Sequence, residues 1–309
     1  MDHFVLASLL SVVSIHNFTF GVLNPALGYA MSCLGAFLGL RCVALSRYYS
    51  GLTRARWLVM AAVSMGATGM WTMHFIAMLG FTVQGQTIYY DVPLTIGSML
   101  VSVAAVGTGL FISDVNRARF VSTGVFPADW PRLLTGGVVI GAGATAMHYM
   151  GMAAMSMKDP VSYSVPLVVL SVLVAVAAGT LALWIATWVH GLVATLGAAL
   201  VMGLAVTVMH YTGMAALQVG GGLGPTSSMP TTGAASAPGI SVVSGMAAAN
   251  IVIPLLLVIS LLTFVLTLTI TLSPNEKEIV ADAELARQLR YLERRRTVAA
   301  NRPGNARRR

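Results

Sequence analysis

Hydrophobic residues recur along this chain in runs of about 20 residues or more, separated by short turns that hold most of the polar positions. A helical run of that length is long enough to cross a bilayer. The runs lack the alternation of barrel strands, and a helix pairs all its backbone groups inside lipid. The predicted fold class is therefore all-α, a polytopic membrane bundle of seven transmembrane helices. The predicted spans are residues 24–46, 57–81, 93–115, 132–157, 162–188, 191–217 and 250–273.

Part of this pattern is repeated within the chain. The stretch "VPLTIGSMLVSVAAVGTGLFI" at 92–112 matches "VPLVVLSVLVAVAAGTLALWI" at 165–185, and each precedes a helix that ends in a Met-His motif. The first helix pair fits the same pattern more loosely. Repeats of this kind predict a stacked or pseudo-symmetric architecture. We therefore expect three copies of a two-helix unit, in parallel pseudo-threefold arrangement, followed by a seventh helix.

Composition and charge agree with a membrane protein. The chain of 309 residues is 57% hydrophobic and 9% charged, whereas a soluble domain has about a quarter of its residues charged. Basic residues cluster in alternate loops and in the segment after residue 275, while the other loops carry only Lys158. By the positive-inside rule, the N-terminus is predicted to lie outside and the C-terminus in the cytoplasm. The net charge of +8 is thus explained by topology, and no nucleic-acid partner is expected.

The segments outside the helices give three domain-level predictions. Residues 1–23 hold an apolar stretch too short to span a bilayer and preceded by an acid, so they are predicted to be an outer lead-in at the interface. Residues 24–273 form the transmembrane domain. Residues 274–309 form a basic cytoplasmic tail, and the outer segment 218–249, rich in Gly, Ser, Pro and Thr, is predicted to be flexible.

The tail has two alternative roles. Residues 275–296 are compatible with a helix that places leucines on one side, at Leu285, Leu289 and Leu292, together with Ile279. Its arginines favour an electrostatic anchor to anionic lipid on the cytoplasmic side of the bilayer. The alternative is a docking helix for a separate cytoplasmic output protein.

Three copies of one motif carry the candidate chemistry. They read "TMHFIAML" at 72–79, "TAMHYMGMAAM" at 145–155 and "TVMHYTGMAAL" at 207–217. At 1.5 Å per residue, each motif histidine lies about 24–28 Å from the cytoplasmic edge of its helix. Three equivalent helices therefore bring three imidazoles to one level near the outer face. The histidines are His74, His148 and His210.

Methionines accompany each histidine at two spacings. A methionine four residues later shares the helix face of the histidine, and a methionine immediately before it points about 100° away. The first set is Met78, Met152 and Met214. The second set, which could reach a shared centre between helices, is Met73, Met147 and Met209.

Imidazole and thioether ligands without carboxylate or thiolate are suited to copper, especially Cu(I). A single buried histidine with its methionines would be compatible with packing alone, but three copies at one depth favour a copper site. His190 is expected to be solvated in a cytoplasmic turn, and His3 and His16 are external, with their approach to the copper site as a less favoured alternative. The two cysteines, Cys33 and Cys42, are nine residues apart in one helix and are not expected to pair.

With these motifs, the sequence resembles the MHYT-domain family of bacterial integral membrane proteins over about residues 24–273. The copies here read Met73-His74-Phe75-Ile76, Met147-His148-Tyr149-Met150 and Met209-His210-Tyr211-Thr212. The resemblance implies a sensor domain in the bacterial plasma membrane. It also implies that Met and His residues hold copper and that this copper senses oxygen, carbon monoxide or nitric oxide. Phe75 stands where the motif has tyrosine, so a role that needs three phenolic hydroxyls is not expected.

Family members often continue into a cyclic-di-nucleotide synthase, a phosphodiesterase or a histidine kinase, and the 36 residues after position 273 are too short for one. No phosphate-binding loop, nucleophile triad or acid pair is found, so this chain is expected not to be an enzyme. Two other functions stay open. A copper-ion transporter would need ligands through its whole depth, whereas the inner halves of the His-bearing helices hold few. A membrane protein with bis-histidine haem is the third possibility.

Overall fold

The computed structural model describes most of the chain, which divides into two units, residues 1–267 and 268–309. The described residues are 15–16, 19–83, 87–113, 130–156, 161–189, 191–219 and 246–273, with 278, 281, 284–285 and 288–294 in the tail. Several predictions fall outside the described residues, namely those for His3, Lys158, His190 and most of the segments 1–23 and 218–249. Within the tail, residues 288–294 are helical, and Leu289 and Leu292 are exposed.

All seven predicted spans are helical, and each helix is long and apolar enough to cross a membrane. The chain is therefore a multi-pass membrane protein. The helices are α2 (Leu23–Ser46), α3 (Gly51–Val63) continued by η1 (Ser64–Trp71) and α4 (Thr72–Met78), α5 (Val92–Ser113), α6 (Trp130–Ala153), α7 (Val165–Trp188), α8 (Leu192–Ala215) and α9 (Ala248–Thr271).

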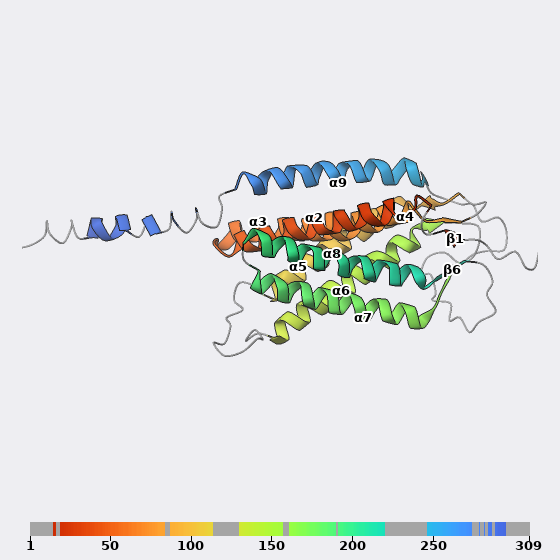
Figure 1. Ribbon diagram of the computed structural model, residues 1–309, viewed down its shortest axis with the longest axis horizontal. Helices are drawn as coiled ribbons and strands as arrows, with labels where there is room; N and C mark the ends of the chain where they lie inside the picture. Colours follow the sequence, from red (N-terminus) through yellow and green to blue (C-terminus); the bar gives the residue numbers. More distant parts are fainter. Residues whose placement is uncertain are drawn as a thin grey trace, which may run out of the picture. The chain divides into compact units, whose positions relative to one another are not determined.

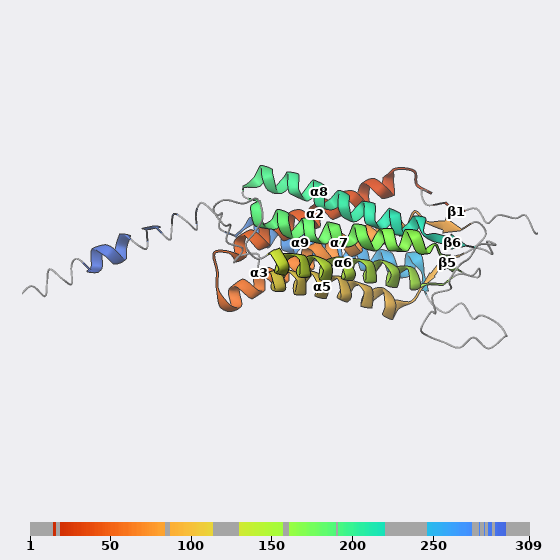
Figure 2. The same ribbon diagram turned by 90° about the horizontal axis from the view of Figure 1, so that it is seen from below.

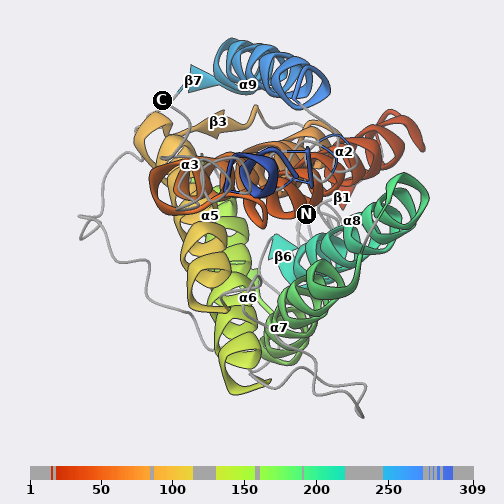
Figure 3. The ribbon, with the colours of Figure 1, turned by 90° about the vertical axis from the view of Figure 1, so that its left-hand side faces the viewer.

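Within the first unit, the helices form three pairs around a common axis (Figure 3). The pairs are α2 with the continuous helix α3–η1–α4, α5 with α6, and α7 with α8, and they run side by side in Figures 1 and 2. The ring closes because α5 also packs on α3 and η1, α6 on α7, and α8 on α2. Close approach is possible where both helices present glycine. A methyl group at Gly136 would lie 2.7 Å from the carbonyl oxygen of Gly109.

Short strands lie at one end of the bundle, which we call the strand end (Figure 1). In each two-helix unit, the strand that enters the first helix pairs antiparallel with the strand that leaves the second. We call these strand pairs ribbons. A seventh strand, which precedes α9, pairs with the first strand of the second unit and extends that ribbon. The pairs are β1 (Ile15–His16) with β2 (Thr82–Val83), β3 (Tyr89–Tyr90) with β4 (Met155–Ser156) and β7 (Met246–Ala247), and β5 (Val161–Tyr163) with β6 (Leu217–Val219).

One hydrogen bond is repeated at the same position in all three units. The backbone N–H that precedes the first helix donates to the carbonyl of the residue six positions after the motif histidine. The bonds are Thr19 to Gly80 (3.1 Å), Asp91 to Ala154 (2.8 Å) and Ser164 to Ala216 (2.8 Å). The threefold repeat therefore includes the turns as well as the helices.

The ribbons correct the predicted ends of several helices. The predictions 132–157, 162–188 and 191–217 each included residues that the structure places in strands. Those residues include Met155, Tyr163 and Leu217, so hydrophobicity alone does not mark the boundary, and the residues pair with a distant strand instead. The predicted helix 57–81 begins earlier, at Gly51, so six residues ahead of the apolar run are also helical.

A π-helical segment, η1, interrupts the first motif-bearing helix just before the motif. The Thr72 hydroxyl donates to the carbonyl of Ala67, five residues back (3.0 Å). Trp71 is fully buried, and its indole N–H lies 3.1 Å from both the Thr95 carbonyl and the Ser98 hydroxyl. Within the described residues π geometry occurs in this unit alone, so the threefold repeat is not exact. Such segments occur frequently at functional sites.

Candidate metal centre

Three histidines from three different helices meet on the inside of the bundle. His74 is on α4, His148 on α6 and His210 on α8, and their exposed fractions are 0%, 0% and 1%. The ring centroids are 5.0, 5.0 and 5.1 Å apart, and the ring planes meet at 81–85°. The three imidazoles are therefore related by the same pseudo-threefold axis as the helices.

The rings present the same nitrogen to one another. His74 Nδ1 lies 3.1 Å from His210 Nδ1 and 3.2 Å from His148 Nδ1. In the ring plane, a neutral imidazole nitrogen carries either one hydrogen or one lone pair. His74 Nδ1 can therefore make one good hydrogen bond, not two. A cation that accepts a lone pair from each ring would satisfy all three Nδ1 atoms at once.

The distances fit a shared metal ion. Two nitrogens bound to one ion at about 2.0–2.1 Å and at a tetrahedral angle stand about 3.3–3.4 Å apart. The observed separations of 3.1 and 3.2 Å are close to that value. The three histidines could thus hold one metal ion, and within the described residues no acidic side chain joins the cluster.

The outer nitrogens of two rings face glycines on the neighbouring helices. A methyl group at Gly151 would overlap His74 Nε2, and a methyl group at Gly213 would overlap His148 Nε2. Both Nε2 atoms are buried without a hydrogen-bond partner among the described residues. Metal-binding histidines usually donate this N–H to an acceptor that orients the ring. In this cluster, close packing against glycine orients the rings instead.

The six predicted methionines are all buried near the histidines, but they do not all share one environment. Met73 packs against Gly28 of α2, and Met209 lines a cavity on the side of the histidines away from the strands. Met78, Met152 and Met214, one turn after the histidines, have exposed fractions of 2%, 2% and 5%. The ligand role of the methionines stays a prediction.

Each histidine also contacts the aromatic residue that follows it. The ring centroids are 4.9 Å apart in all three pairs, with the rings edge to face. The Tyr149 hydroxyl hydrogen-bonds with Ser171 (2.8 Å), whereas Phe75 is fully buried 4.4 Å from Trp71. Phenylalanine suits that apolar position because a buried hydroxyl would need a partner.

The glycine contacts were missed by sequence reasoning. Gly151 and Gly213 each lie three residues after a histidine, and the sequence analysis assigned them no contact with an imidazole. Their constant spacing from the histidine was the available signal. The first copy has Ala77 at this position, so a glycine three residues after the histidine occurs in two of the three repeats.

Comparison with known proteins places the same regions among bacterial signalling proteins. The family described as "MHYT: Bacterial signalling protein N terminal repeat" matches residues 68–124 and 141–199. These two matches include His74 and His148, while His210 lies beyond them.

Three curated relatives are bacterial. The chain is 41% identical over 167 residues to the bifunctional diguanylate cyclase/cyclic di-GMP phosphodiesterase MucR of Pseudomonas aeruginosa, covering 52% of this chain and 23% of that protein. It is 34% identical over 210 residues to the cyclic di-GMP phosphodiesterase NbdA of the same organism, covering 66% and 25%. It is 31% identical over 205 residues to the signaling protein YkoW of Bacillus subtilis, covering 64% and 24%.

The chain thus spans about a quarter of the length of these relatives. The activities in the names of these relatives belong to the full-length proteins. No solved structure matches the chain.

Proposed function

Because the chain belongs to the family of bacterial membrane signalling proteins that carry the MHYT repeat, we propose that it is a membrane sensor whose three motif histidines bind a copper ion. The observation that carries this proposal is the meeting of three Nδ1 atoms in a buried cluster without acidic groups. His74, His148 and His210 would be the nitrogen ligands, and each would hold its proton on Nε2.

Within the described residues, the cluster has no negatively charged ligands, and this favours Cu(I) over a divalent ion. The Born cost of taking an ion out of water grows with the square of its charge, so a divalent ion costs about four times as much as a monovalent ion of the same size. Three neutral imidazoles do not offset that cost as carboxylates would. Cu(I) also suits neutral imidazole and thioether ligands, whereas Mg²⁺, Ca²⁺ and Mn²⁺ favour oxygen.

The methionines are proposed as additional soft ligands. Met78, Met152 and Met214 follow the histidines by one helical turn and therefore project from the same side of each helix. Their burial keeps water away from the cluster. Met73, Met147 and Met209 are proposed as a second set, which could contact the ion from between the helices.

The signal is proposed to be a diatomic gas, such as oxygen, carbon monoxide or nitric oxide, or the redox state of the surroundings. When bound, copper would supply a centre that accepts such a gas or changes its charge. The protein's own part is to hold three rings from three helices around one point. A change in how strongly the rings are held together would alter the packing of those helices.

Transmission of the signal is proposed to end in a cytoplasmic output protein. The basic residues of the alternate loops and the tail favour a cytoplasmic C-terminus under the positive-inside rule. The motif then lies near the outer face, and the tail is available to a partner. The relatives with cyclic di-GMP in their names support an output of that general kind.

The geometry favours this function over the two alternatives. Two axial imidazoles of a haem have their metal-bound nitrogens about 4 Å apart, across the porphyrin, whereas these Nδ1 atoms are 3.1 and 3.2 Å apart. A copper transporter is favoured by one observation, because Met65 and Met202 line the cavity beyond the histidines. Farther from the histidines, that cavity is lined by alanine, leucine and similar residues, which offer no ligands.

The proposal is tested by the metal content of single-histidine variants. Protein purified from copper-replete cells should hold about one copper per chain by mass spectrometry. Replacement of His148 with alanine should remove most of it, because two nitrogens remain where three were available. His190→Ala is the control, since His190 lies between α7 and α8 in the sequence, 20 residues before His210.

A pair of methionine variants on one helix tests the thioether ligands. Met214→Leu and Met202→Leu change volume little, and both methionines are buried on α8. Met214→Leu should weaken Cu(I) binding in a competition titration with a chelator, while Met202→Leu should not. Equal copper in the parent, in His148→Ala and in His190→Ala would show that the cluster is a packing motif.

A further inference from the structure

A cavity of about 50 Å³ lies within the ring of six helices. Its lining comes from α2, η1, α5, α6, α7 and α8, and it lies on the side of the histidines away from the strands. Along α7, the lining extends from Ala175 to Ala186, which corresponds to about 16 Å of helix axis. The cavity is therefore narrow and elongated along the membrane normal.

The chemistry of the lining keeps water out. Ser32 is the only polar side chain among the lining residues in the described part of the chain. A buried water needs two to four polar partners, and a site for one water needs about 10–15 Å³. The cavity has room for several waters but does not offer them partners. Apolar cavities of this kind stay dry and take up apolar guests such as xenon.

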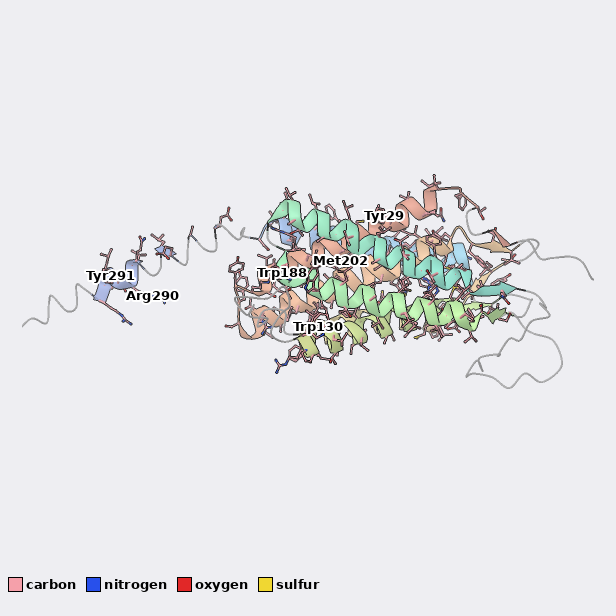
Figure 4. All side chains as sticks on the ribbon, turned by 60° about the horizontal axis from the view of Figure 1, so that its bottom comes forward. Tyr29, Trp130, Trp188, Met202, Arg290 and Tyr291 are labelled. Carbon is pink, nitrogen blue, oxygen red and sulfur yellow. The ribbon has the colours of Figure 1, made fainter. Side chains whose placement is uncertain are left out.

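One end of the cavity reaches the histidine cluster. Met70 and Met209 both line it, and Met70 is one helical turn before His74, while Met209 adjoins His210. Met202, labelled on α8 in Figure 4, lines the cavity two turns farther from the motif. A guest at this end would contact methionine side chains that lie within one helical turn of the motif histidines in the sequence, and such side chains are flexible.

The cavity also approaches the surface that faces lipid. Most of its lining residues are buried, but Ala178 and Ala182 on α7 and Val206 on α8 are partly exposed. These side chains are small. The bilayer is the phase in which small apolar gases concentrate, so this side of the bundle provides the shortest path for such a molecule.

We propose that the cavity is a binding site for small apolar gas molecules, which enter from the bilayer between α7 and α8 and are held beside the histidine cluster. The occupancy of the cavity follows from its apolar lining alone. Its purpose, delivery of gas to the cluster, rests on the proposed gas-responsive copper centre. The two parts can be tested separately.

Occupancy is tested with xenon on the full chain. Crystals pressurised with xenon should show anomalous density in the cavity of the parent protein, with or without copper. Ala144→Val adds two methyl groups at a buried lining position on α6 and should abolish that density. Ala177→Leu, on the lipid-facing side of α7, should leave it unchanged.

Delivery is tested by the rate at which carbon monoxide associates with the Cu(I)-loaded protein. Ala178→Leu narrows the partly exposed side of the cavity and should slow association, while the neighbouring Ala177→Leu should not. The infrared band of bound carbon monoxide should stay the same in both variants, because the ligands are untouched. An unchanged rate in Ala178→Leu and Ala144→Val would overturn the delivery role.

Three other outcomes would also support or overturn the gas site or the delivery role. A parent crystal without xenon in the cavity would overturn the binding site, whether or not copper is bound. Xenon in a chain that binds no metal would support the site but overturn delivery together with the proposed function. Copper density inside the cavity, away from the histidines, would replace the gas site with an ion path.

Discussion

Glycine is the residue that shapes the histidine cluster. A Cβ atom at Gly213 would overlap the His148 ring, and one at Gly151 would overlap the His74 ring. Each glycine lies three residues after the histidine of its own helix, so it faces the ring of another unit. The spacing of three residues therefore brings each glycine against the histidine of a different two-helix unit. The ring fits there because glycine has no side chain.

Alanine at position 213 is expected to disturb the cluster. Overpacking of a well-packed site typically costs about 1–3 kcal/mol, because the imidazole or the helix must shift. The Gly213→Ala variant should unfold at a lower temperature than the parent and, under the proposed function, hold less copper. Thermal unfolding in detergent and metal analysis of the same sample measure the two effects.

The matched control is Gly197→Ala on the same helix. Nothing lies within 4 Å of a Cβ at Gly197, and alanine within a helix is favoured over glycine by roughly 0.5–1 kcal/mol. This variant should be as stable as the parent or more stable, with its copper unchanged. If the two variants behave alike, the glycine beside His148 has no special role.

Among the secondary-structure elements, the short ribbons define the repeating unit. Each unit is a strand, two helices and a strand, and the strands pair with each other at the strand end. Strands of two or three residues are too short to be stable alone, so the helices must hold them in place. The hydrogen bond from Ser164 to Ala216 shows how the third unit is closed.

A cross-strand disulfide tests the register of the third ribbon. Ser162 lies opposite Gln218, and opposite residues in an antiparallel pair have Cα atoms about 4.5–5.5 Å apart, within the range of a disulfide. In a chain without Cys33 and Cys42, cysteines at these two positions should join under mild oxidation. Mass spectrometry of protease fragments detects the bond.

The control shifts one cysteine by a single residue. Side chains alternate between the two faces of a strand, so cysteines at Ser162 and Leu217 point to opposite faces and should stay reduced. Equal crosslinking of both pairs would contradict the register Ser162 to Gln218.

At the scale of the whole molecule, the two ends of the bundle differ in chemistry. The strand end carries the motif histidines, and the opposite end carries the tryptophans Trp130 and Trp188, which are partly exposed at the ends of α6 and α7 (Figure 4). Tryptophans often mark the membrane–water interface. Arg47 and Arg54 also lie at that opposite end, and the positive-inside rule predicts that this end faces the cytoplasm.

This orientation is tested by labelling intact cells with a membrane-impermeant thiol reagent. In the same chain without native cysteines, Gln218→Cys lies at the strand end, and Thr53→Cys lies at the first turn of α3, and both positions are exposed. The reagent should label Gln218→Cys in intact cells, and Thr53→Cys only after the cells are opened. Labelling of Thr53→Cys alone in intact cells would show that the protein is inserted the other way round.

The seven helices, the repeated units and the common level of the three histidines could all be predicted from the sequence. These features depend on local quantities, since a run such as 165–185 has the length and hydrophobicity of a span in any context, and His148 sits at a set number of residues along its helix. The tertiary structure alone decided the features that depend on partners distant in the chain. Leu217 continues the apolar run of the helix before it, but it belongs to the strand Leu217–Val219, which pairs with the distant strand Val161–Tyr163. Likewise, helical spacing shows which side His74 faces, but which nitrogen it turns to His148 and His210 depends on the space left by Gly151 on another helix.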